Sequence, residues 1–501
     1  METSPNQIYD KYINGRLDKS STIDQLISII ENSNHAFIRA ESLKILEKLG
    51  AKQNKVFHIL ENLLISDSNE RVRNHAAHAI RTLFIDRAFD PMQWAYDHEP
   101  SAKCLVTIIL SLGEIPTYKS KSFLLKKLSK IENPQFKKHL DYLFKSEKFN
   151  NYSNKHLAEI LNNYIVVKYF EDRFSRIYYK IREGFVTELD LSSISSNVFG
   201  WNILKRLPEF ISVLQKLTKI DLKINRISTL PYSLGYIVSL KYLDLSNNII
   251  KRLPTSIGML ISLEYLYLRY NNLRTIPSSI GFLENLKVID LRHNKINTLP
   301  NSLKKLSNLE VLDLHGNQIH TIPDSIGKLS SLKKLELGLN NIKEMPNWLQ
   351  NLQALEILGL GGNKLLTKLP EWIVSFPSLS ELSLYDNNLK KLPGSIGNLR
   401  SLEELTLRNN QIKDLPESLK NLQSLKRLNL SWNNFTSLPE WIGSLSSLEE
   451  LNLWGNKLHS LPESLGSMKS LKILNLNFNR FIKEIPEPIR ALQAEGLIVY
   501  K

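Results

Sequence analysis

From residue 217 onward, apolar residues recur along the chain in one fixed pattern, LxxLxLxxNxIxxLPxxIGxLxx. The step between copies is 23 residues, except that two copies each gain one residue, in NKLLTKLP and NRFIKEIP. Full copies begin at Leu217, Leu240, Leu263, Leu286, Leu309, Leu332, Leu355, Leu379, Leu402, Leu425, Leu448 and Leu471. A degenerate copy precedes these twelve, because Val186, Leu189 and Leu191 fit the same apolar positions. A period this regular predicts a stack of similar units.

The alternation in LxxLxL predicts a short strand whose leucines face inward. The proline of the LP pair fixes φ just after the turn and prevents a long helix from forming there. The IGxL segment then buries two more apolar residues on the return side. One copy cannot cover its own apolar face, so neighbouring copies must stack. The pattern therefore predicts a curved solenoid with parallel strands along its inner side.

An asparagine occupies the ninth position of every full copy. These residues are Asn225, Asn248, Asn271, Asn294, Asn317, Asn340, Asn363, Asn387, Asn410, Asn433, Asn456 and Asn479. An amide side chain both donates and accepts hydrogen bonds. Stacked copies can therefore satisfy the backbone where it turns away from the strand, as a buried bend requires. We interpret this column as a structural asparagine ladder.

The first 185 residues show helical periodicity. The segments NSNHAFIRAESLKILEKL (32–49) and DSNERVRNHAAHAIRTL (67–83) have the same pattern, with Arg39 and Arg73 placed 34 residues apart. This region resembles HEAT-like repeats, which are antiparallel helix pairs stacked into a solenoid. An ordinary helix bundle is the alternative, because small residues at helical spacing also suit a bundle.

Three parts of the chain follow from these patterns. We expect a HEAT-like α-helical domain at 1–153, a helical cap or linker at 154–185 and a repeat domain at 186–501. The segment 154–181 is predicted to be one long amphipathic helix that closes the amino-terminal end of the stack. The tail ALQAEGLIVYK is predicted to hold a last strand, within a carboxyl-terminal cap at about 487–501.

The repeat is similar to that of the leucine-rich repeat family, and specifically to its Ras-group intracellular class, whose 23-residue unit has the same LPxxIGxL return. The similarity extends from residue 186 to about 493. It implies an α/β solenoid, a horseshoe with a parallel concave sheet, here preceded by an all-α HEAT-like helical solenoid. It also implies a non-catalytic scaffold that binds a protein partner on the concave face, such as a small GTPase or a signalling enzyme in signal transduction.

Composition adds limited information. The chain is 42% hydrophobic and 23% charged, with a net charge of +15 that favours acidic partners, nucleic acid or anionic membrane surfaces. Cys104 is the only cysteine, which excludes an intramolecular disulfide and favours a reducing compartment. The first residues contain no apolar run, and no segment approaches the roughly 18 consecutive apolar residues of a membrane helix. We therefore expect a cytoplasmic protein with no transmembrane segment.

The stretch LEYLYLRYNNL (263–273) suggests a binding site. If the leucines point inward, positions three, five and seven of each copy face the concave side, and position eight lies on its rim. The candidate contact residues are Tyr265, Tyr267, Arg269, Tyr270, Arg292 and His293. Tyrosine and arginine dominate binding hot spots. The alternative is that tyrosine simply suits a strand.

A second aromatic group occupies the seventh or eighth position of later copies. Its members are Tyr385, Trp432, Trp454 and Phe478. They are predicted either to contact a partner or to pack along the rim between copies. Between the two groups, the glycines at 338, 359, 361 and 362 are expected to leave the face bare. Simple drift of the repeat is the favoured explanation, and close approach of a partner to the backbone is the alternative.

The fifth position has carboxylates in the first half of the repeat, at Asp221, Asp244, Asp290, Asp313 and Glu336. Two interpretations stay open. The carboxylates either pair with basic residues two positions along, such as Lys223 and Arg292, or form a surface that attracts a partner of mixed charge.

The most basic stretch contains Lys119, Lys121, Lys126, Lys127, Lys130, Lys137 and Lys138. We interpret it as a solvated helix face. The alternative function is a basic adaptor that binds nucleic acid or an anionic membrane through this region. Few aromatic residues lie among these lysines, which argues against nucleic acid.

Motifs of catalysis are absent from the sequence, which has no Walker loop, no HExxH and no nucleophile elbow. Cys104 lies in an apolar helical run and is interpreted as a core residue. We therefore expect no enzymatic activity, no cofactor and no metal site.

Overall fold

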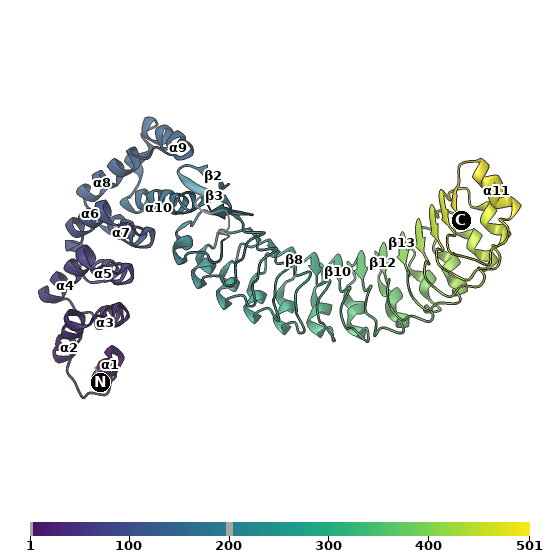
Figure 1. The fold of residues 1–501 in the computed structure, drawn as a ribbon, viewed down its shortest axis with the longest axis horizontal. Helices are drawn as coiled ribbons and strands as arrows, with labels where there is room; N and C mark the ends of the chain where they lie inside the picture. Colours follow the sequence, from purple (N-terminus) through teal and green to yellow (C-terminus); the bar gives the residue numbers. More distant parts are fainter. Residues whose placement is uncertain (1–3, 197–203) are drawn as a thin grey trace. The chain divides into compact units, whose positions relative to one another are not determined.

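The computed structural model describes residues 4–196 and 204–501, which form two compact units (Figure 1). The first consists chiefly of Met1–Asp190 and Pro208–Leu217, and the second chiefly of Thr218–Lys501. Residues 197–203, within the degenerate first copy of the repeat, lie outside the described residues.

The first unit is built mainly from α-helices. They are α1 (Pro5–Ile13), α2 (Lys19–Asn32), α3 (Ala36–Lys48), α4 (Asn54–Ser66), α5 (Glu70–Leu83), α6 (Phe89–His98), α7 (Ala102–Glu114), α8 (Tyr118–Ser129), α9 (Pro134–Lys145) and α10 (Asn154–Glu171), with short 3-10 turns η1 (Ile85–Arg87) and η2 (Lys148–Asn151). Helices α3, α5, α7 and α10 pack side by side in one row, and α2, α4, α6 and α8 each pack against a member of that row (Figure 1). The unit is therefore a stack of helix pairs.

Two arginines fix the loops between successive pairs. Arg39 donates two hydrogen bonds to the Asp67 carboxylate and a third to the Ser33 carbonyl, at 2.9–3.0 Å. Arg73 repeats this arrangement in the next pair with Glu99 and the Asp67 carbonyl, at 2.8 Å. Both carboxylates are buried, with side chains 5% and 2% exposed. The 34-residue spacing of the arginines thus corresponds to one layer of the helical stack.

The prediction of one amphipathic helix over 154–181 is wrong in two respects. Helix α10 ends at Glu171, and it is buried on nearly all sides rather than on one. Residues after it form β1 (Phe174–Ser175) and β2 (Tyr178–Arg182), and β2 pairs antiparallel with β3 (Phe185–Asp190). The turn residues Glu183 and Gly184 both have positive φ, which is the geometry of a two-residue hairpin turn. The short strand β4 (Ser195–Ser196) pairs with β1.

The second unit confirms the predicted solenoid, because its strands pair in parallel and in chain order (Figure 1). They are β5 (Lys219–Asp221), β6 (Tyr242–Asp244), β7 (Tyr265–Tyr267), β8 (Val288–Asp290), β9 (Val311–Asp313), β10 (Lys334–Glu336), β11 (Ile357–Gly359), β12 (Glu381–Ser383), β13 (Glu404–Thr406), β14 (Arg427–Asn429), β15 (Glu450–Asn452), β16 (Ile473–Asn475) and β17 (Ile498–Tyr500). The register is that of the repeat, so that Leu266 pairs with Leu243 on one side and Ile289 on the other.

The return side consists of short 3-10 helices, most of which begin directly after the LP proline. They are η3 (Glu209–Val213, in the first unit), η4 (Tyr232–Tyr236), η5 (Thr255–Met259), η6 (Ser278–Phe282), η7 (Asn301–Lys305), η8 (Asp324–Lys328), η9 (Asn347–Asn351), η10 (Glu371–Ser375), η11 (Ile396–Asn398), η12 (Glu417–Asn421), η13 (Glu440–Ser444) and η14 (Glu463–Ser467). Ile257 in η5 and Leu260 directly after it are buried and fill the core. A Cβ at Gly258 would lie 2.3 Å from the Ser279 carbonyl oxygen of the next copy, so close stacking requires glycine there.

The asparagines at position nine are buried and link neighbouring copies. Asn294 donates from Nδ2 to the carbonyls of Leu268 and Leu291, at 2.9 and 3.0 Å. Its Oδ1 accepts the backbone N–H of Leu273, at 3.0 Å. One side chain therefore satisfies backbone groups of two copies at the point where the strand ends.

Helix α11 (Glu487–Ala494) and strand β17 complete the second unit. Helix α11 packs on η14, and β17 pairs with β16. The tail thus contains the expected last strand, together with a short helix before it.

Candidate functional site

The eighth position of most copies has a left-handed backbone. Its non-glycine residues have φ between 48° and 57° and are Ile224, Asn247, Tyr270, His293, Leu339, Asp386, Asn409, Trp432 and Phe478. Glycine and asparagine adopt this conformation readily, whereas bulky side chains are strained in it. Yet Tyr270, Trp432 and Phe478 occupy it with side chains that are 43–62% exposed. Exposed aromatic residues on a strained backbone are typical of functional surfaces.

A cluster of rings and cations lies on strands β6–β8 and the turns that follow them. We define it as the tyrosine patch: Tyr242, Tyr265, Tyr267, Arg269, Tyr270, Arg292 and His293. The ring of Tyr242 lies 5.3 Å from Tyr267 and 6.3 Å from Tyr265, between ring centroids. Tyr270 stacks on His293 with centroids 4.5 Å apart and planes 12° apart. The structure thus brings the first group of predicted contact residues together on adjacent strands.

The tyrosine patch is less exposed than the sequence suggested. Arg269 and Tyr270 are exposed, but Tyr265 and Tyr267 are half-buried because their rings pack against Tyr242. Arg292 and His293 are also half-buried. The directly accessible part of the patch is therefore its rim, with the tyrosines of the strands forming a platform beside it.

Tyr242 is a member of the patch that the sequence interpretation missed. It occupies position three of the preceding copy, the same column as Tyr265, and the two strands pair at these residues. The Lys219 ammonium lies 4.8 Å from the centre of its ring. Burial raises the pKa of the Tyr242 hydroxyl, with nearby Asp244 adding to the shift. Comparing residues column by column, rather than within one stretch, would have found it.

The carboxylates at position five cap their own strands. Asp221, Asp244, Asp290 and Asp313 are 4–8% exposed, and each accepts the backbone N–H two residues further on, at 2.9–3.1 Å. Arg292 also pairs with Asp290 at 2.7 Å and lies 3.3 Å from Asp313. These contacts favour internal pairing over the interpretation of an attracting surface, because buried, bonded carboxylates present little charge to a partner.

Asp313 is the carboxyl group with the most altered acidity in this region. Burial raises its pKa to about 6, although the His315 N–H and Arg292 oppose the shift. Burial lowers the pKa of the adjacent His315 imidazole, and the positive charge of Arg292 acts in the same direction. The Asp313 carboxyl group on β9 therefore loses its proton closer to neutral pH than a surface aspartate does.

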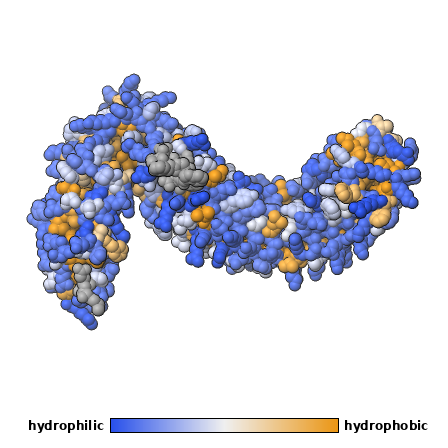
Figure 2. Space-filling model, viewed as in Figure 1, coloured by the Kyte–Doolittle hydropathy of each residue, from blue (hydrophilic) through white to orange (hydrophobic). Residues whose placement is uncertain are grey.

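A second aromatic cluster lies further along the repeat. We define it as the tryptophan patch: Trp432, Trp454 and Phe478. Centroids are 5.5 Å apart between the first two rings and 5.9 Å between the last two, with planes tilted by 56° and 52°. Trp432 and Phe478 are exposed and Trp454 is half-buried. Figure 2 shows exposed apolar residues gathered at this carboxyl-terminal end.

Tyr385 lies apart from the tryptophan patch. Arg408 and Asn409 occupy positions seven and eight of the copy between Tyr385 and Trp432. The ring of Tyr385 instead covers Gly361, where an added Cβ would lie 2.3 Å from the ring carbon Cδ1. The second predicted group is therefore divided by an intervening copy.

The glycines between the patches do not leave a bare face, which corrects the sequence interpretation. Neighbouring side chains occupy the space that a Cβ would need: His315 at Gly338, Glu336 at Gly359, Tyr385 at Gly361 and Leu339 at Gly362. These glycines therefore accommodate large residues of adjacent copies.

The basic stretch of the first unit lies on α8, on α9 and on the turn between them. Lys127 pairs with Asp97 and lies 4.9 Å from the ring centres of Tyr96 and Phe123. Lys121 donates to the Asn150 carbonyl at 2.9 Å. Lys119, Lys126, Lys130, Lys137 and Lys138 are exposed. Two of the seven lysines therefore have structural contacts, and five face solvent.

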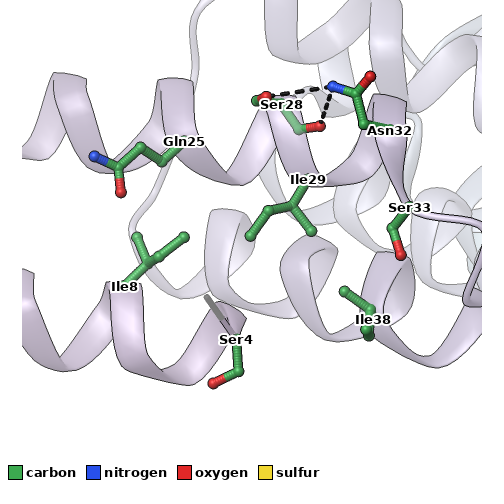
Figure 3. Close-up of a pocket in the computed structure, with 8 residues that line it drawn as sticks. All are labelled: Ser4, Ile8, Gln25, Ser28, Ile29, Asn32, Ser33 and Ile38. Carbon is green, nitrogen blue, oxygen red and sulfur yellow. Dashed lines mark hydrogen bonds between the residues drawn. The ribbon is translucent and has the colours of Figure 1, made fainter. Parts of the chain in front are cut away.

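A small pocket opens between α1, α2 and α3 in the first unit (Figure 3). Ile8, Ile29 and Ile38 line it together with the polar residues Ser4, Gln25, Ser28, Asn32 and Ser33, around a volume of about 320 Å³. The Asn32 amide donates to the Ser28 carbonyl at 2.8 Å. Its lining holds no acid, base or nucleophilic thiol, so it does not offer catalytic chemistry.

Groups of three or more histidine, cysteine or carboxylate side chains that could hold a metal ion do not occur among the described residues. Cys104 is buried, and its thiol donates to the Glu70 carbonyl at 3.1 Å. Burial raises the pKa of this thiol to about 12, which disfavours the reactive thiolate. None of the helices in residues 4–196 and 204–501 has the length and apolar character needed to cross a bilayer.

Comparisons with known proteins agree with this geometry. The family described as leucine-rich repeat region matches residues 280–367 and 371–492, and a model of two leucine-rich repeats matches residues 238–283. A leucine-rich repeat protein of Leptospira interrogans is 36% identical, with 60% of this chain and 76% of that chain covered and a TM-score of 0.58. An internalin of Listeria monocytogenes is 24% identical, with 63% and 86% covered and a TM-score of 0.54, which supports the fold alone. The search of curated proteins gives no match.

Proposed function

The chain belongs to the leucine-rich repeat family, and on this basis we propose that it is a non-catalytic scaffold that binds a protein partner on its concave face. The stacked pair Tyr270–His293 beside Arg269 is the observation that supports this most directly. Tyr270 is half exposed and has a left-handed backbone, although an asparagine fills the same position in the preceding copy without strain. An aromatic residue at that position indicates a contact rather than a structural need.

The tyrosine patch has the composition of a binding hot spot. Tyrosine rings supply large contact areas with little loss of side-chain entropy, and Arg269 and Tyr270 lie beside a platform that is already partly desolvated. Tyr265 and Tyr267 are held by Tyr242, so a partner would meet a preorganised surface. The platform also contains buried, internally paired carboxylates, so the net character presented at the rim is aromatic and basic. We infer a partner with acidic and apolar groups on its matching surface.

The repeat resembles the Ras-group intracellular class, and we propose a cytoplasmic role in signal transduction with a small GTPase or a signalling enzyme as partner. We further propose that the helical unit is a HEAT-like solenoid, because the Arg39 and Arg73 layers repeat at a HEAT-like spacing. These assignments rest on resemblance, and identification of the bound partner tests them.

A basic adaptor is the second candidate function. The five exposed lysines of α8 and α9 would attract an anionic membrane or nucleic acid. The salt dependence of binding distinguishes the two functions. Binding to phosphates weakens steeply as salt rises because counterions are released, whereas a tyrosine hot spot weakens little.

The test is affinity capture from native lysate with the full chain and a variant, Arg269→Ser/Tyr270→Asn. This variant copies Ser246 and Asn247 from the preceding repeat, so it removes the rim of the patch while keeping a sequence that the fold already accepts. A partner retained by the wild type and lost by the variant supports the proposal. Equal recovery by both proteins, or recovery of nuclease-sensitive material, contradicts it.

A further inference from the structure

We propose that the tryptophan patch and the strands beside it bind a proline-rich segment in the polyproline II conformation. The inference rests on the proposed protein-binding role of the concave face, but it uses other residues than the tyrosine patch. It follows from a row of hydrogen-bond donors on β14–β16 and from the tilt of the rings next to that row.

The donor row consists of Asn429, Asn452 and Asn475 at position five of three successive copies. Adjacent strands pair at these residues, so the three side chains are in register. Each Oδ1 accepts the backbone N–H two residues on, from Ser431, Trp454 and Asn477, at 3.0–3.1 Å. This bond fixes the amide, so that Nδ2 points away from the backbone. Within the described residues, these three Nδ2 groups have no protein acceptor, and each residue is only half-buried.

The donor row is uncharged, whereas position five of the earlier copies carries negative charge. There the same position has aspartate at 221, 244, 290 and 313, which accepts the equivalent backbone N–H but offers no donor. Three uncharged donors in a line are complementary to peptide carbonyl oxygens, which carboxylates would repel. The row therefore selects a main-chain partner rather than a basic side chain.

Spacing distinguishes between the backbone conformations of such a partner. Neighbouring strands lie about 4.8 Å apart, so the outer donors, at Asn429 and Asn475, are separated by roughly 9.6 Å. A polyproline II helix rises about 3.1 Å per residue with three residues per turn, so equivalent carbonyls recur at roughly 9.3 Å. Equivalent carbonyls of a β-strand recur at roughly 6.8 Å, which fits poorly. The two outer donors therefore match one turn of polyproline II, and Asn452 at the midpoint has no equivalent carbonyl.

The aromatic rings of the tryptophan patch follow the donor row along the same three copies. The rings of Trp432, Trp454 and Phe478 are tilted by more than 50° against their neighbours, and Trp432 and Phe478 are exposed. Polyproline II segments are recognised by exposed aromatic side chains. Stacking of sugar rings would instead require flat, open aromatic faces. A proline-rich segment lying across β14–β16 would set its rings against the tryptophan patch and carbonyls one turn apart against Asn429 and Asn475.

The experiment is calorimetric titration of the full chain with a nine-residue oligoproline, with a glycine-serine peptide of equal length as the comparison. We expect saturable binding of oligoproline alone. The variant Asn429→Asp/Asn475→Asp keeps the strand-capping acceptors, as the aspartates of earlier copies do, and should weaken binding at least tenfold. Trp432→Asn, which the left-handed backbone accommodates, should do the same. Asn421→Asp on the return side is the matched control for the added charge and should leave affinity unchanged.

Three results would overturn the inference: no binding of oligoproline to the wild type, equal affinity in the wild type and the Asn429→Asp/Asn475→Asp variant, or binding of a linear oligosaccharide in its place. The Arg269→Ser/Tyr270→Asn variant separates this inference from the proposed function. It should bind oligoproline like the wild type while losing the partner of the tyrosine patch. Loss of oligoproline binding in this variant would contradict the present inference, whereas retention of the partner would contradict the proposed function alone.

Discussion

Tyr270 lies flat on the imidazole of His293 in the next copy, with ring centroids 4.5 Å apart. His293 in turn fills the space above Gly316, where an added Cβ would lie 2.6 Å from its Nδ1. The rim of the concave face is therefore a directional stack, in which a large side chain of one copy covers a small or flat residue of the following copy. The predictions below test which of these positions serve stability and which serve binding.

We expect Ile224 to lower the stability of the protein relative to an asparagine at the same position. It is β-branched, has φ of 56° and is 53% exposed. The left-handed conformation costs an ordinary residue roughly 1–2 kcal/mol, so Ile224→Asn should raise the free energy of unfolding by about 1 kcal/mol. Ile249→Asn is the matched control, because Ile249 is similarly exposed but lies outside the left-handed residues. Urea denaturation of both variants measures the difference. A loss of stability in Ile224→Asn would show that its side chain packs more usefully than its backbone is strained.

The asparagines at position nine should be essential to stacking. Asn271→Ala removes donations to Leu245 and Leu268 and leaves the Ile250 N–H without its acceptor. We expect a loss on the order of 2–4 kcal/mol in unfolding free energy, because buried backbone groups lose their partners. Asn272→Ala, one residue on and without such bonds, should change stability by less than about 0.5 kcal/mol. Similar effects of the two changes would contradict a structural ladder.

The acidity of Asp313 should make stability depend on pH. Its folded-state pKa, about 6, lies above that of the unfolded chain, so its favourable contribution is complete below roughly pH 4 and is lost as pH rises through 6. Asp313→Asn keeps an acceptor for the His315 N–H and removes this dependence. The unfolding free energy of the variant, measured relative to that of the wild type, should therefore rise by roughly 2 kcal/mol from pH 4.5 to pH 8. Unfolding curves at the two pH values measure the gain, and an equal difference at both would show that Arg292 already compensates the charge.

The Arg73–Glu99 layer should stabilise the helical unit. Arg73→Met leaves the Glu99 carboxylate, 2% exposed, with a hydrogen bond from the Ser101 N–H but without its arginine partner. Loss of one partner of a buried pair costs about 3–5 kcal/mol. Replacing both residues, in Arg73→Met/Glu99→Met, should recover most of that loss, since no buried charge remains. Arg71→Met, on the exposed side of the same helix, is the control. Thermal unfolding followed by circular dichroism would contradict this view if the double variant were the least stable of the three.

The repeat could be predicted from sequence because each position has one structural role that recurs at a fixed step. Leucine columns, the LP turn and the asparagine at position nine all follow from burial and backbone bonding within one copy. The segment YYKI (178–181) was predicted incorrectly as helix, because the left-handed turn at Glu183–Gly184 was overlooked beside an apolar helical run.

The surface was harder to predict because it depends on neighbouring copies. The tyrosines at 265 and 267 look exposed in a single stretch, and only the adjacent strand shows that Tyr242 covers them. Glycines at 338 and 361 look bare, but His315 and Tyr385 fill their space. The carboxylates at position five resemble a charged surface until their bonds to the backbone are seen. Contacts between copies decide exposure, and they require the register of the stack.

The central claim is that a protein binds the rim of the tyrosine patch. The most direct measurement is the dissociation constant of the captured partner for the wild type, for Arg269→Ser/Tyr270→Asn and for Arg408→Ser, a control on the same face away from the patch. Loss of a central aromatic and arginine pair costs about 2–4 kcal/mol at a hot spot, so the double variant should bind at least tenfold more weakly. Arg408→Ser should bind like the wild type. Equal constants for all three proteins would contradict the tyrosine patch as the binding site.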